Sequence, residues 1–216
     1  MTVSRKAWLA ERAKGIGSSD VAAVLGLSPY KSNTELWEEK VGIRKPKDIS
    51  EVEYVKNGTM SEDPLRQLFA VDYPEYEVLH EENEMMIHPV YDFIRCSPDS
   101  RLIEKVTGRK GFLEIKRCEI SNSASYQKWQ DGKIPEYYYT QTLQYFLVDP
   151  EMEFGYLRAY LVRHMGNGDI HREIRDYKIA DSRSEIEEEL EYLLPKEIEF
   201  WDCVVKRKRP ARIIML

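Results

Sequence analysis

Apolar residues recur along this chain at two different spacings, which predict alternating blocks of helices and strands. Leu65, Leu68 and Phe69 are three to four residues apart, as on one face of a helix. Other stretches are rich in β-branched and aromatic residues, as is typical of strands. We expect helices over residues 18–25, 32–42, 50–71, 123–130, 135–148 and 182–205, and strands over residues 76–88, 93–103, 112–118, 154–163 and 170–179.

Local signals place several of the expected boundaries. Ser32 and Glu35 have the spacing of a capping box, and Ser182 and Glu185 repeat that spacing before the last helix. The Gly-Asn-Gly sequence at residues 166–168 predicts a hairpin between the last two strands.

The order of the elements predicts the fold class. Helices precede, interrupt and follow the strands, so we expect an α/β or α+β protein with a central mixed β-sheet flanked by helices. Neither an internal repeat nor a long linker divides the 216 residues. We therefore expect a single domain, with a helical part at 1–75, the sheet and its site at 76–180, and a helix with a basic tail at 181–216.

Composition narrows the setting of the protein. Its hydrophobic content of 42% and charged content of 32% are those of an ordinary soluble protein. No apolar run approaches the roughly 20 residues of a membrane span, and residues 1–11 lack the apolar stretch of a signal peptide. Cys96, Cys118 and Cys203 are too few for a disulfide framework or a four-cysteine iron–sulfur cluster, so we expect a cytoplasmic protein.

The net charge of −6 argues weakly against a nucleic-acid partner. The acidic residues are concentrated around 81–84 and 185–191, however, whereas residues 206–209 are all basic. A basic cleft is therefore compatible with the overall charge, and bound cations would offset clustered carboxylates. The basic segment is either a solvated end or a contact to a DNA backbone, and the sequence leaves both interpretations open.

The strongest chemical signal is an acidic residue followed, fifteen positions later, by a Glu-Ile-Lys run. Asp99 precedes Glu114, Ile115 and Lys116, and this run lies in an expected strand. Neighbouring side chains of a strand point to opposite faces, so Glu114 and Lys116 share a face. Asp99, Glu114 and the Ile115 carbonyl can hold Mg²⁺, and Lys116 would lie near an attacking water.

The Glu-x-Lys pattern alone has little specificity. The run Glu38-Glu39-Lys40 contains the same residue types on an expected helix, where a solvated face explains it. The Glu114 run differs because it is strand-like and because Asp99 follows another strand-like segment. A metal-dependent nuclease and a surface ion pair remain the two interpretations of these residues.

Several motifs resemble a known family. They are the stretches at 15–22 and 26–30, the Gly58–Glu62 segment, Ser97-Pro98-Asp99 with Glu114-Ile115-Lys116, and Tyr139-Thr140-Gln141. Together they resemble the YqaJ-type viral recombinase family, which is related to phage lambda exonuclease. The matches run from Arg12 to about Val148, some two thirds of the chain. The resemblance implies a restriction-endonuclease-like fold with a PD-(D/E)xK motif.

The resemblance also implies roles for individual residues. Asp99, Glu114 and the Ile115 carbonyl would be metal ligands and Lys116 the catalytic lysine, as the residues themselves indicate. Glu62 would be a helical carboxylate that binds metal directly or through water. Without the resemblance, a solvated position on a helix face would explain Glu62 equally well.

A pocket for a terminal 5′-phosphate is implied as well. Its members would be Arg12, Ser19, Ser97 and Gln141, because one cation and short polar donors suit a dianionic group. Ser19 also has a plain structural interpretation as a helix cap, and both roles are compatible. The family usually shows Gln-x-Gln, whereas here the second glutamine is replaced by Leu143 or displaced to Gln144.

The function implied by the resemblance is a Mg²⁺-dependent DNA exonuclease. It would use two ions, with Mn²⁺ as a substitute, and digest linear duplex DNA from 5′ to 3′ to leave 3′ overhangs for phage-type recombination. A structure-specific or restriction-like endonuclease and a non-catalytic DNA-end-binding module are the alternatives. A single-strand annealing protein, a homo-oligomer such as a trimer, and a phage or prophage origin are further expectations.

Two groups of residues carry weaker signals. The tyrosines at 137–139 suggest base stacking, but neighbours on a helix cannot share one face, so packing is the preferred interpretation. The histidines show no metal-ligand spacing and are interpreted as surface or core residues: His80, His88, His164 and His171.

Overall fold

The computed structural model describes residues 4–48, 51–166 and 168–214. The elements follow in the order α1 (Arg5–Arg12), β1 (Ile16–Gly17), the 3₁₀ turn η1 (Ser18–Asp20), α2 (Val21–Val24), α3 (Asn33–Lys40), α4 (Glu53–Asp72), β2 (Tyr76–Leu79), β3 (Met86–Ile87), β4 (Ile94–Cys96), β5 (Ser100–Glu104), β6 (Lys110–Ile120), α5 (Ser123–Gln127), α6 (Glu136–Val148), β7 (Met152–His164), β8 (Ile170–Ala180), the 3₁₀ turn η2 (Arg183–Ile186) and α7 (Glu187–Val205). Within the described residues, no helix is both long and apolar enough to span a membrane.

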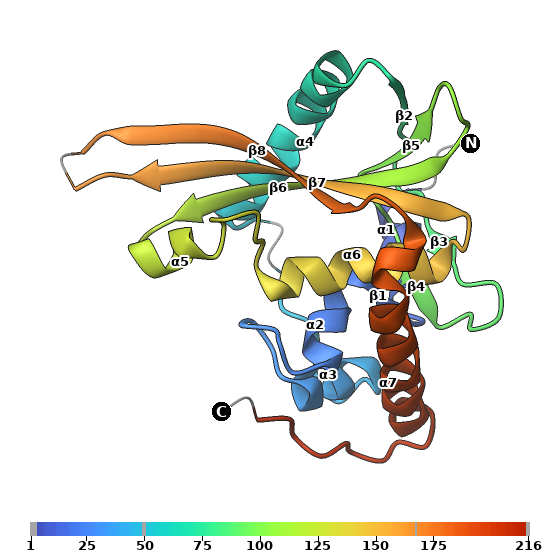
Figure 1. The fold of residues 1–216 in the computed structure, drawn as a ribbon. Coiled ribbons are helices and arrows are strands. Elements are labelled where there is room, and N and C mark those ends of the chain that lie inside the picture. Colours follow the sequence, from blue (N-terminus) through green and yellow to red (C-terminus); the bar gives the residue numbers. More distant parts are fainter. Residues whose placement is uncertain (1–3, 49–50, 167, 215–216) are drawn as a thin grey trace.

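A five-stranded mixed sheet forms the centre of the fold, in the order β2-β5-β6-β7-β8. Strands β6 and β7 are parallel, with α6 as the crossover between them, and the other neighbours are antiparallel. A smaller sheet, β1-β4-β3, lies beside it. Figure 1 shows α4 on one side of the central sheet and α6 on the other, which agrees with the expected sheet flanked by helices.

The side chains of β6 alternate between these two helices. Leu113 and Ile115 pack with Leu65 and Phe69 of α4. Phe112 points the other way, into the core cluster that contains α6. The alternation is the period of two that the sequence predicted for this strand, and it places the polar positions of β6 under α6.

A glycine on β7 allows Phe112 to lie flat against the sheet. A Cβ atom at Gly155 would lie only 2.2 Å from the Phe112 ring, so a larger residue would displace it. The ring of Phe112 then meets Tyr145 of α6 edge-on, with centroids 4.7 Å apart. This stack fixes the depth at which α6 sits over β6.

A buried arginine fastens α4 to the same sheet. Arg158 on β7 is fully buried and pairs with Asp72, at the end of α4, and with Asp176 on β8. It also donates to the main-chain oxygen of Leu65. Removing one partner of such a buried ion pair is costly, because the other charge remains without compensation. The pairing therefore holds α4 in a fixed position on the sheet.

The strands expected at 76–88 and 93–103 are each wrong as continuous strands. Both break in the middle, and the two halves join different sheets. The first break spans residues 80–85, where Asn83 has a positive φ of 60°. The second spans residues 97–99. A chain that changes sheets must leave the ladder, and hydrophobic patterning alone does not show where it does so.

The helical expectations hold with shifted bounds. The segment at 18–25 begins with a 3₁₀ turn, and the helix at 123–130 ends at Gln127. The helix at 50–71 spans Glu53–Asp72, and Ser50 lies outside the described residues. Helix α1 and the short strand β1 were not predicted.

Of the two expected capping boxes, one forms. The Ser32 hydroxyl accepts the N–H of Glu35 at 3.3 Å, and Glu35 accepts the N–H of Ser32 at 2.9 Å. The second expectation is wrong, because Glu185 accepts the N–H of Asp181 instead and the chain enters a 3₁₀ turn. The β7–β8 hairpin forms as expected, with Asn167 outside the described residues.

Candidate active site

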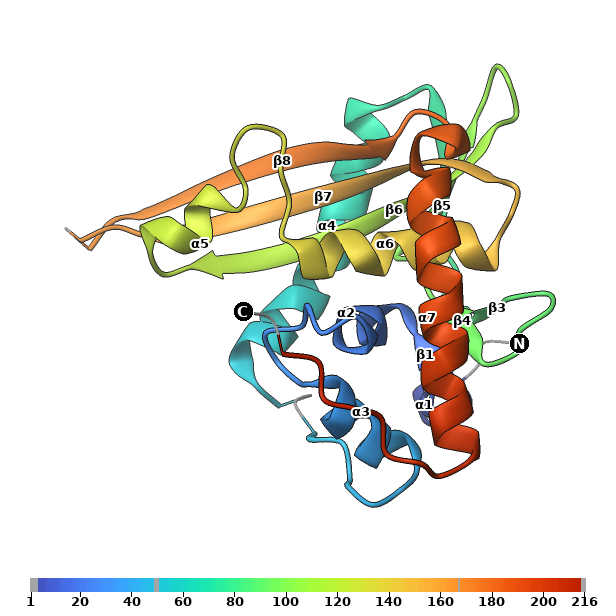
Figure 2. The ribbon, with the colours of Figure 1, turned by 60° about the horizontal axis from the view of Figure 1, so that its bottom comes forward.

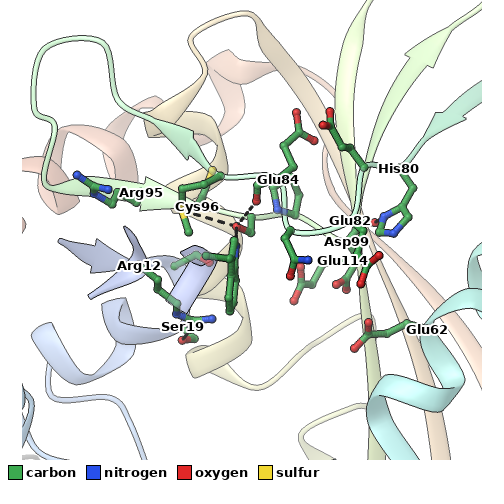
Figure 3. Close-up of a pocket in the computed structure, with 18 of the residues that line it drawn as sticks. Arg12, Ser19, Glu62, His80, Glu82, Glu84, Arg95, Cys96, Asp99 and Glu114 are labelled. Atoms are coloured by element: carbon green, nitrogen blue, oxygen red, sulfur yellow. Dashed lines mark hydrogen bonds between the residues drawn. The ribbon is translucent and has the colours of Figure 1, made fainter. Parts of the chain in front are cut away.

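A cavity of about 400 Å³ opens where α1, η1 and α4 meet the end of β4 and the middle of β6. Eight of the nine candidate residues line it, namely Arg12, Ser19, Glu62, Ser97, Asp99, Glu114, Lys116 and Gln141. The ninth, Ile115, turns its side chain into the core under α4. In Figure 3 the carboxylates of Glu62, Asp99 and Glu114 gather at one end, and Arg12 and Ser19 lie at the other. Folding therefore brings together residues that are far apart in the sequence.

Glu114 and Lys116 form an ion pair on the α6 side of β6. Lys116 Nζ lies 2.6 Å from Glu114 Oε1, and Glu114 is only 2% exposed. Burial disfavours the ammonium, but the charges of Glu114 and Asp99 outweigh it and hold the pKa of Lys116 above its ordinary value. The ion pair therefore favours the charged form of Lys116.

Asp99 is bound to the same strand through the main chain. Its Oδ2 atom accepts the N–H of Ile115 at 2.6 Å. The ladder between β5 and β6 runs only as far as Leu113, so Asp99 takes up the strand edge directly beyond it. Because the N–H and C=O of one strand residue point to the same edge, the Ile115 carbonyl faces the Asp99 side as well.

The charge of Glu114 disfavours the ionised forms of the two carboxyl groups beside it, Asp99 and Glu62. Burial, followed by the charge of Glu114, raises the pKa of Asp99 well above its ordinary value. The same two causes, in the same order, raise the pKa of Glu62 on α4. A pocket that crowds buried carboxylates in this way is favourable for a cation.

The donor set fits a hard divalent cation that keeps much of its water. Among the described residues, no three His, Cys, Asp or Glu side chains form a complete ligand cluster. The pocket offers the carboxylates of Asp99 and Glu114, with Glu62 nearby, and the Ile115 carbonyl faces the same edge of β6 as Asp99. Mg²⁺ prefers oxygen ligands and retains several waters, so this set is sufficient for it. No soft ligand is supplied by Cys96, whose buried thiol has a pKa raised well above its ordinary value.

Two residues of α6 hold the Glu114 carboxylate from above. Gln141 Nε2 donates to Glu114 Oε1 at 2.7 Å, and the Tyr145 hydroxyl donates to Oε2 at 2.5 Å. Burial, and next the charge of Glu114, raise the pKa of the Tyr145 phenol well above its ordinary value, so it keeps its proton. Gln141 thus has a contact to the carboxylate that the phosphate-pocket assignment did not include.

Gln144 has a purely structural environment. Its side chain is fully buried and donates to the main-chain oxygens of Ile16 and Arg95 at 2.8 and 2.7 Å. It joins β1 to β4 behind the pocket. Of the two glutamines on this helix, only Gln141 lines the cavity.

At the other end of the cavity, a tryptophan connects the expected phosphate-binding residues. Arg12 donates to the Ser19 hydroxyl, and its guanidinium lies 5.1 Å from the ring centroid of Trp8. Trp8 Nε1 in turn donates to the Ser97 hydroxyl at 3.1 Å. Trp8 was missed because α1 was not predicted, although its spacing of four from Arg12 would place both on one helix face.

His80 was interpreted as a surface or core residue, and the structure places it in the pocket wall. Its Nδ1 atom lies 2.8 Å from the main-chain oxygen of Asp99. A carbonyl oxygen only accepts hydrogen bonds, so the Nδ1 atom of His80 is the donor in this contact. No spacing in the sequence signals this position, because the loop that carries His80 joins two sheets.

The tyrosines at 137–139 are half-buried, as the packing interpretation predicts. Tyr138 lies under the Lys116 ammonium, 5.1 Å from Nζ to the ring centroid, and Tyr137 packs edge-on against Tyr30. In the basic tail, Lys206 pairs with Asp202 and Arg209 with Glu38. Figure 2 shows the tail running back across α3.

Comparison with known proteins places this geometry in a family. The model of the YqaJ-like viral recombinase domain matches residues 7–149. A curated relative, the uncharacterized protein YqaJ of Bacillus subtilis (strain 168), is 32% identical over 212 residues. The alignment covers 97% of this chain and 59% of that protein, so the chain spans about three fifths of its relative's length.

Solved structures share the fold. An alkaline exonuclease from Laribacter hongkongensis superposes with a TM-score of 0.63 at 17% identity, over 94% of this chain and 96% of the other. A phage-related exonuclease from Haemophilus somnus 129PT gives a TM-score of 0.54 at 12% identity, over 89% of this chain and 96% of the other. This likeness confirms the expected restriction-endonuclease-like core. With the family match spanning the pocket from α1 to the end of α6, the chain belongs to the YqaJ-like viral recombinase domain family.

Proposed function

We propose that this chain is a Mg²⁺-dependent DNA exonuclease that digests linear duplex DNA from its 5′ end. The observation that carries the proposal is the convergence of Asp99, Glu114 and Lys116 in one cavity with Arg12 and Ser19 at its far end. Family membership and the fold shared with two exonucleases support it. Phosphodiester hydrolysis at a strand end uses both halves of such a pocket.

At the carboxylate end, the chain supplies ligands and a fixed cation. Asp99, Glu114 and the Ile115 carbonyl would hold Mg²⁺, with Glu62 contacting it directly or through water. When bound, the metal polarises the scissile phosphate and makes water more nucleophilic at neutral pH. Lys116, fixed in its charged form by Glu114, stabilises the negative charge that develops on the phosphoryl oxygens.

At the other end, Arg12, Ser19 and Ser97 would bind the terminal 5′-phosphate. A guanidinium beside two hydroxyls suits a dianion, because charge-assisted hydrogen bonds are about twice as strong as neutral ones. Trp8 holds this group in place through its contacts with Arg12 and Ser97. A pocket that binds a terminal phosphate favours digestion from ends over cutting within a strand.

The test compares three substrates with Mg²⁺ present: linear duplex with 5′-phosphate ends, the same duplex with 5′-hydroxyl ends, and a closed circle. We expect rapid digestion of the phosphorylated linear form, an untouched circle and 3′ overhangs among the products. Nicking of the circle would support an endonuclease. Binding of ends without any metal-dependent product would support a DNA-binding module. Replacing Mg²⁺ by Mn²⁺ is expected to sustain digestion, and the dependence of rate on metal concentration tests for a second ion.

The proposal extends to partners. We propose that the active form is a homo-oligomer, such as a trimer, that cooperates with a single-strand annealing protein in recombination. Light scattering of the purified protein tests whether it is a homo-oligomer. Co-purification of this chain with an annealing protein encoded in the same phage operon tests the partnership.

A further inference from the structure

Both oxygens of the Glu114 carboxylate are occupied by hydrogen-bond donors. Oε1 accepts from Gln141 Nε2 at 2.7 Å and pairs with Lys116 Nζ at 2.6 Å, while Oε2 accepts from the Tyr145 hydroxyl at 2.5 Å. Gln141 Nε2 also donates to the Tyr145 oxygen at 2.9 Å. A carboxylate only accepts, so every donor in this network has one possible direction.

The phenol that closes the network is tightly packed. Tyr145 is fully buried, and its ring meets Phe112 edge-on with centroids 4.7 Å apart. Phe112 is in turn pressed against the bare backbone of Gly155. The position of the Tyr145 hydroxyl is therefore set by the packing of its ring against the sheet.

Tyr145 is not among the residues that line the cavity. It is connected to the cavity through Glu114 and Gln141, both of which line it. Tyr139, six positions earlier on the same helix, gives a useful contrast. It directs its hydroxyl to Glu189 of α7 at 3.4 Å. Of these two phenols on α6, only that of Tyr145 contacts the carboxylate of the pocket.

A carboxylate that binds metal must keep one orientation. In this site the Lys116 ammonium attracts the Oε1 atom of Glu114 from one side. Without a donor on Oε2, the Glu114 carboxylate would turn toward Lys116, which already holds Oε1. The hydroxyl opposes that turn because it fixes the second oxygen. Partners that orient metal ligands in this way typically contribute 10- to 100-fold in metal affinity or activity, by order of magnitude.

We propose that Tyr145, together with Gln141, is a positioning residue that holds Glu114 in the orientation needed to bind the metal ion. The inference rests on the proposed nuclease function and goes beyond it, because it assigns a role to a residue outside the pocket. It also gives Gln141 a second task beside the terminal phosphate.

The test uses Tyr145→Phe, which removes one hydroxyl and keeps the ring against Phe112. Mn²⁺ binding is titrated without DNA by electron paramagnetic resonance, and digestion is measured over a range of Mn²⁺ concentrations. We expect the Mn²⁺ dissociation constant to rise about tenfold or more. We also expect kcat at moderate Mn²⁺ to fall, KM for DNA ends to stay the same, and high Mn²⁺ to restore most of the rate. Tyr139→Phe is the matched control and is expected to leave all four quantities unchanged.

Gln141→Met provides a second removal of a donor if Tyr145→Phe folds poorly, and the same weakening of Mn²⁺ binding is expected. Wild-type binding and digestion with unchanged Mn²⁺ affinity in both variants would overturn the positioning role and leave the proposed function intact. A lower rate that no Mn²⁺ concentration restores, at unchanged affinity, would also overturn it. Failure of the wild-type protein to bind Mn²⁺ or digest DNA would overturn the proposed function, and this inference with it.

Discussion

Asp99 accepts the main-chain N–H of Ile115 at 2.6 Å, which binds the connection between β4 and β5 to the edge of β6. One carboxylate thus has two separate uses: one oxygen completes the strand edge, and its charge faces Glu114 and Glu62. A substitution that keeps the acceptor and removes the charge separates the two uses.

Asp99→Asn is such a substitution, because an amide oxygen can still accept the N–H of Ile115. We expect Mg²⁺-dependent digestion to fall by about 100-fold or more, since one metal ligand loses its charge. The melting temperature is expected to stay the same or rise, because repulsion from the neighbouring Glu114 and Glu62 carboxylates is relieved. Digestion and thermal unfolding measure the two effects, with the exposed Asp92→Asn as control. Unimpaired digestion would remove Asp99 from the metal site.

Lys116→Ala removes the fixed cation next to Glu114. We expect digestion to fall by about 100- to 1,000-fold, because the charge that develops on the phosphate loses its partner. Binding of duplex ends, measured in Ca²⁺ to prevent cutting, is expected to change little. Lys110, at the start of the same strand, pairs with Glu151, and Lys110→Ala serves as control. Retained digestion by Lys116→Ala contradicts the catalytic role.

Arg12→Ala tests recognition of the end group. Digestion of 5′-phosphorylated duplex is expected to slow about tenfold or more, while digestion of 5′-hydroxyl duplex changes little, because a charged hydrogen bond to phosphate is lost. The ratio of the two rates is the informative quantity. The exposed Arg44→Ala, whose partners are Glu35 and Glu38, controls for a general loss of positive charge. An equal slowing on both ends would argue against a phosphate pocket at Arg12.

Glu62→Gln distinguishes a metal-binding carboxylate from a solvated helix position. Glu62 lines the cavity, whereas its neighbour Asp63 is paired with Arg66. We expect Glu62→Gln to weaken Mn²⁺ binding and to lower digestion by about tenfold or more, and Asp63→Asn to leave both unchanged. Equal behaviour of the two variants would favour the solvated interpretation.

Glu197 on α7 makes stability depend on pH. It is fully buried, and neither of its carboxyl oxygens has a hydrogen-bond partner within the described part of the chain. Burial, and then the charge of Asp20, raise the pKa of Glu197 well above its ordinary value of 4.5. Above that value the unfolded chain releases the proton while the folded chain keeps it, so the stability of the fold decreases as pH rises toward the folded pKa.

Glu197→Gln removes this ionisation at nearly constant volume. We expect the melting temperature to rise by a few degrees at about pH 8 and by much less at about pH 5, since 1 kcal/mol corresponds to roughly 2–4 °C at this chain length. The exposed Glu191→Gln on the same helix is the control. A gain that is the same at both pH values would show that ionisation of Glu197 is not its cause.

Sequence reasoning succeeded where chemistry and local pattern coincide. The alternation of Phe112, Glu114 and Lys116 on one face and Ile115 on the other follows from strand geometry alone. The approach of Asp99 to this strand was expected from the spaced motif, and the structure places the two within hydrogen-bond distance. These relations are local or depend on one pairing of neighbouring strands.

What sequence reasoning missed depends on long-range contacts. Trp8 contacts Ser97 across 89 positions, and His80 reaches Asp99 because both lie where the chain passes between the two sheets. The role of Tyr145 depends on Phe112 and Gly155, which come from two different strands. The spacing of apolar residues does not indicate such contacts, because they can be predicted only when the order of the strands in the sheet is known.

The parallel pairing of β6 with β7 sets a lower limit on the piece of this chain that can be expressed by itself. The region matched by the family model stops at residue 149, and β7 begins at Met152. An excised 7–149 fragment would expose β6 along Lys110–Ile120 as an open edge, with apolar side chains beside unpaired amides. Such edges recruit other copies into aggregates. Soluble fragments for biochemical work must therefore extend beyond β8, which covers the far side of β7.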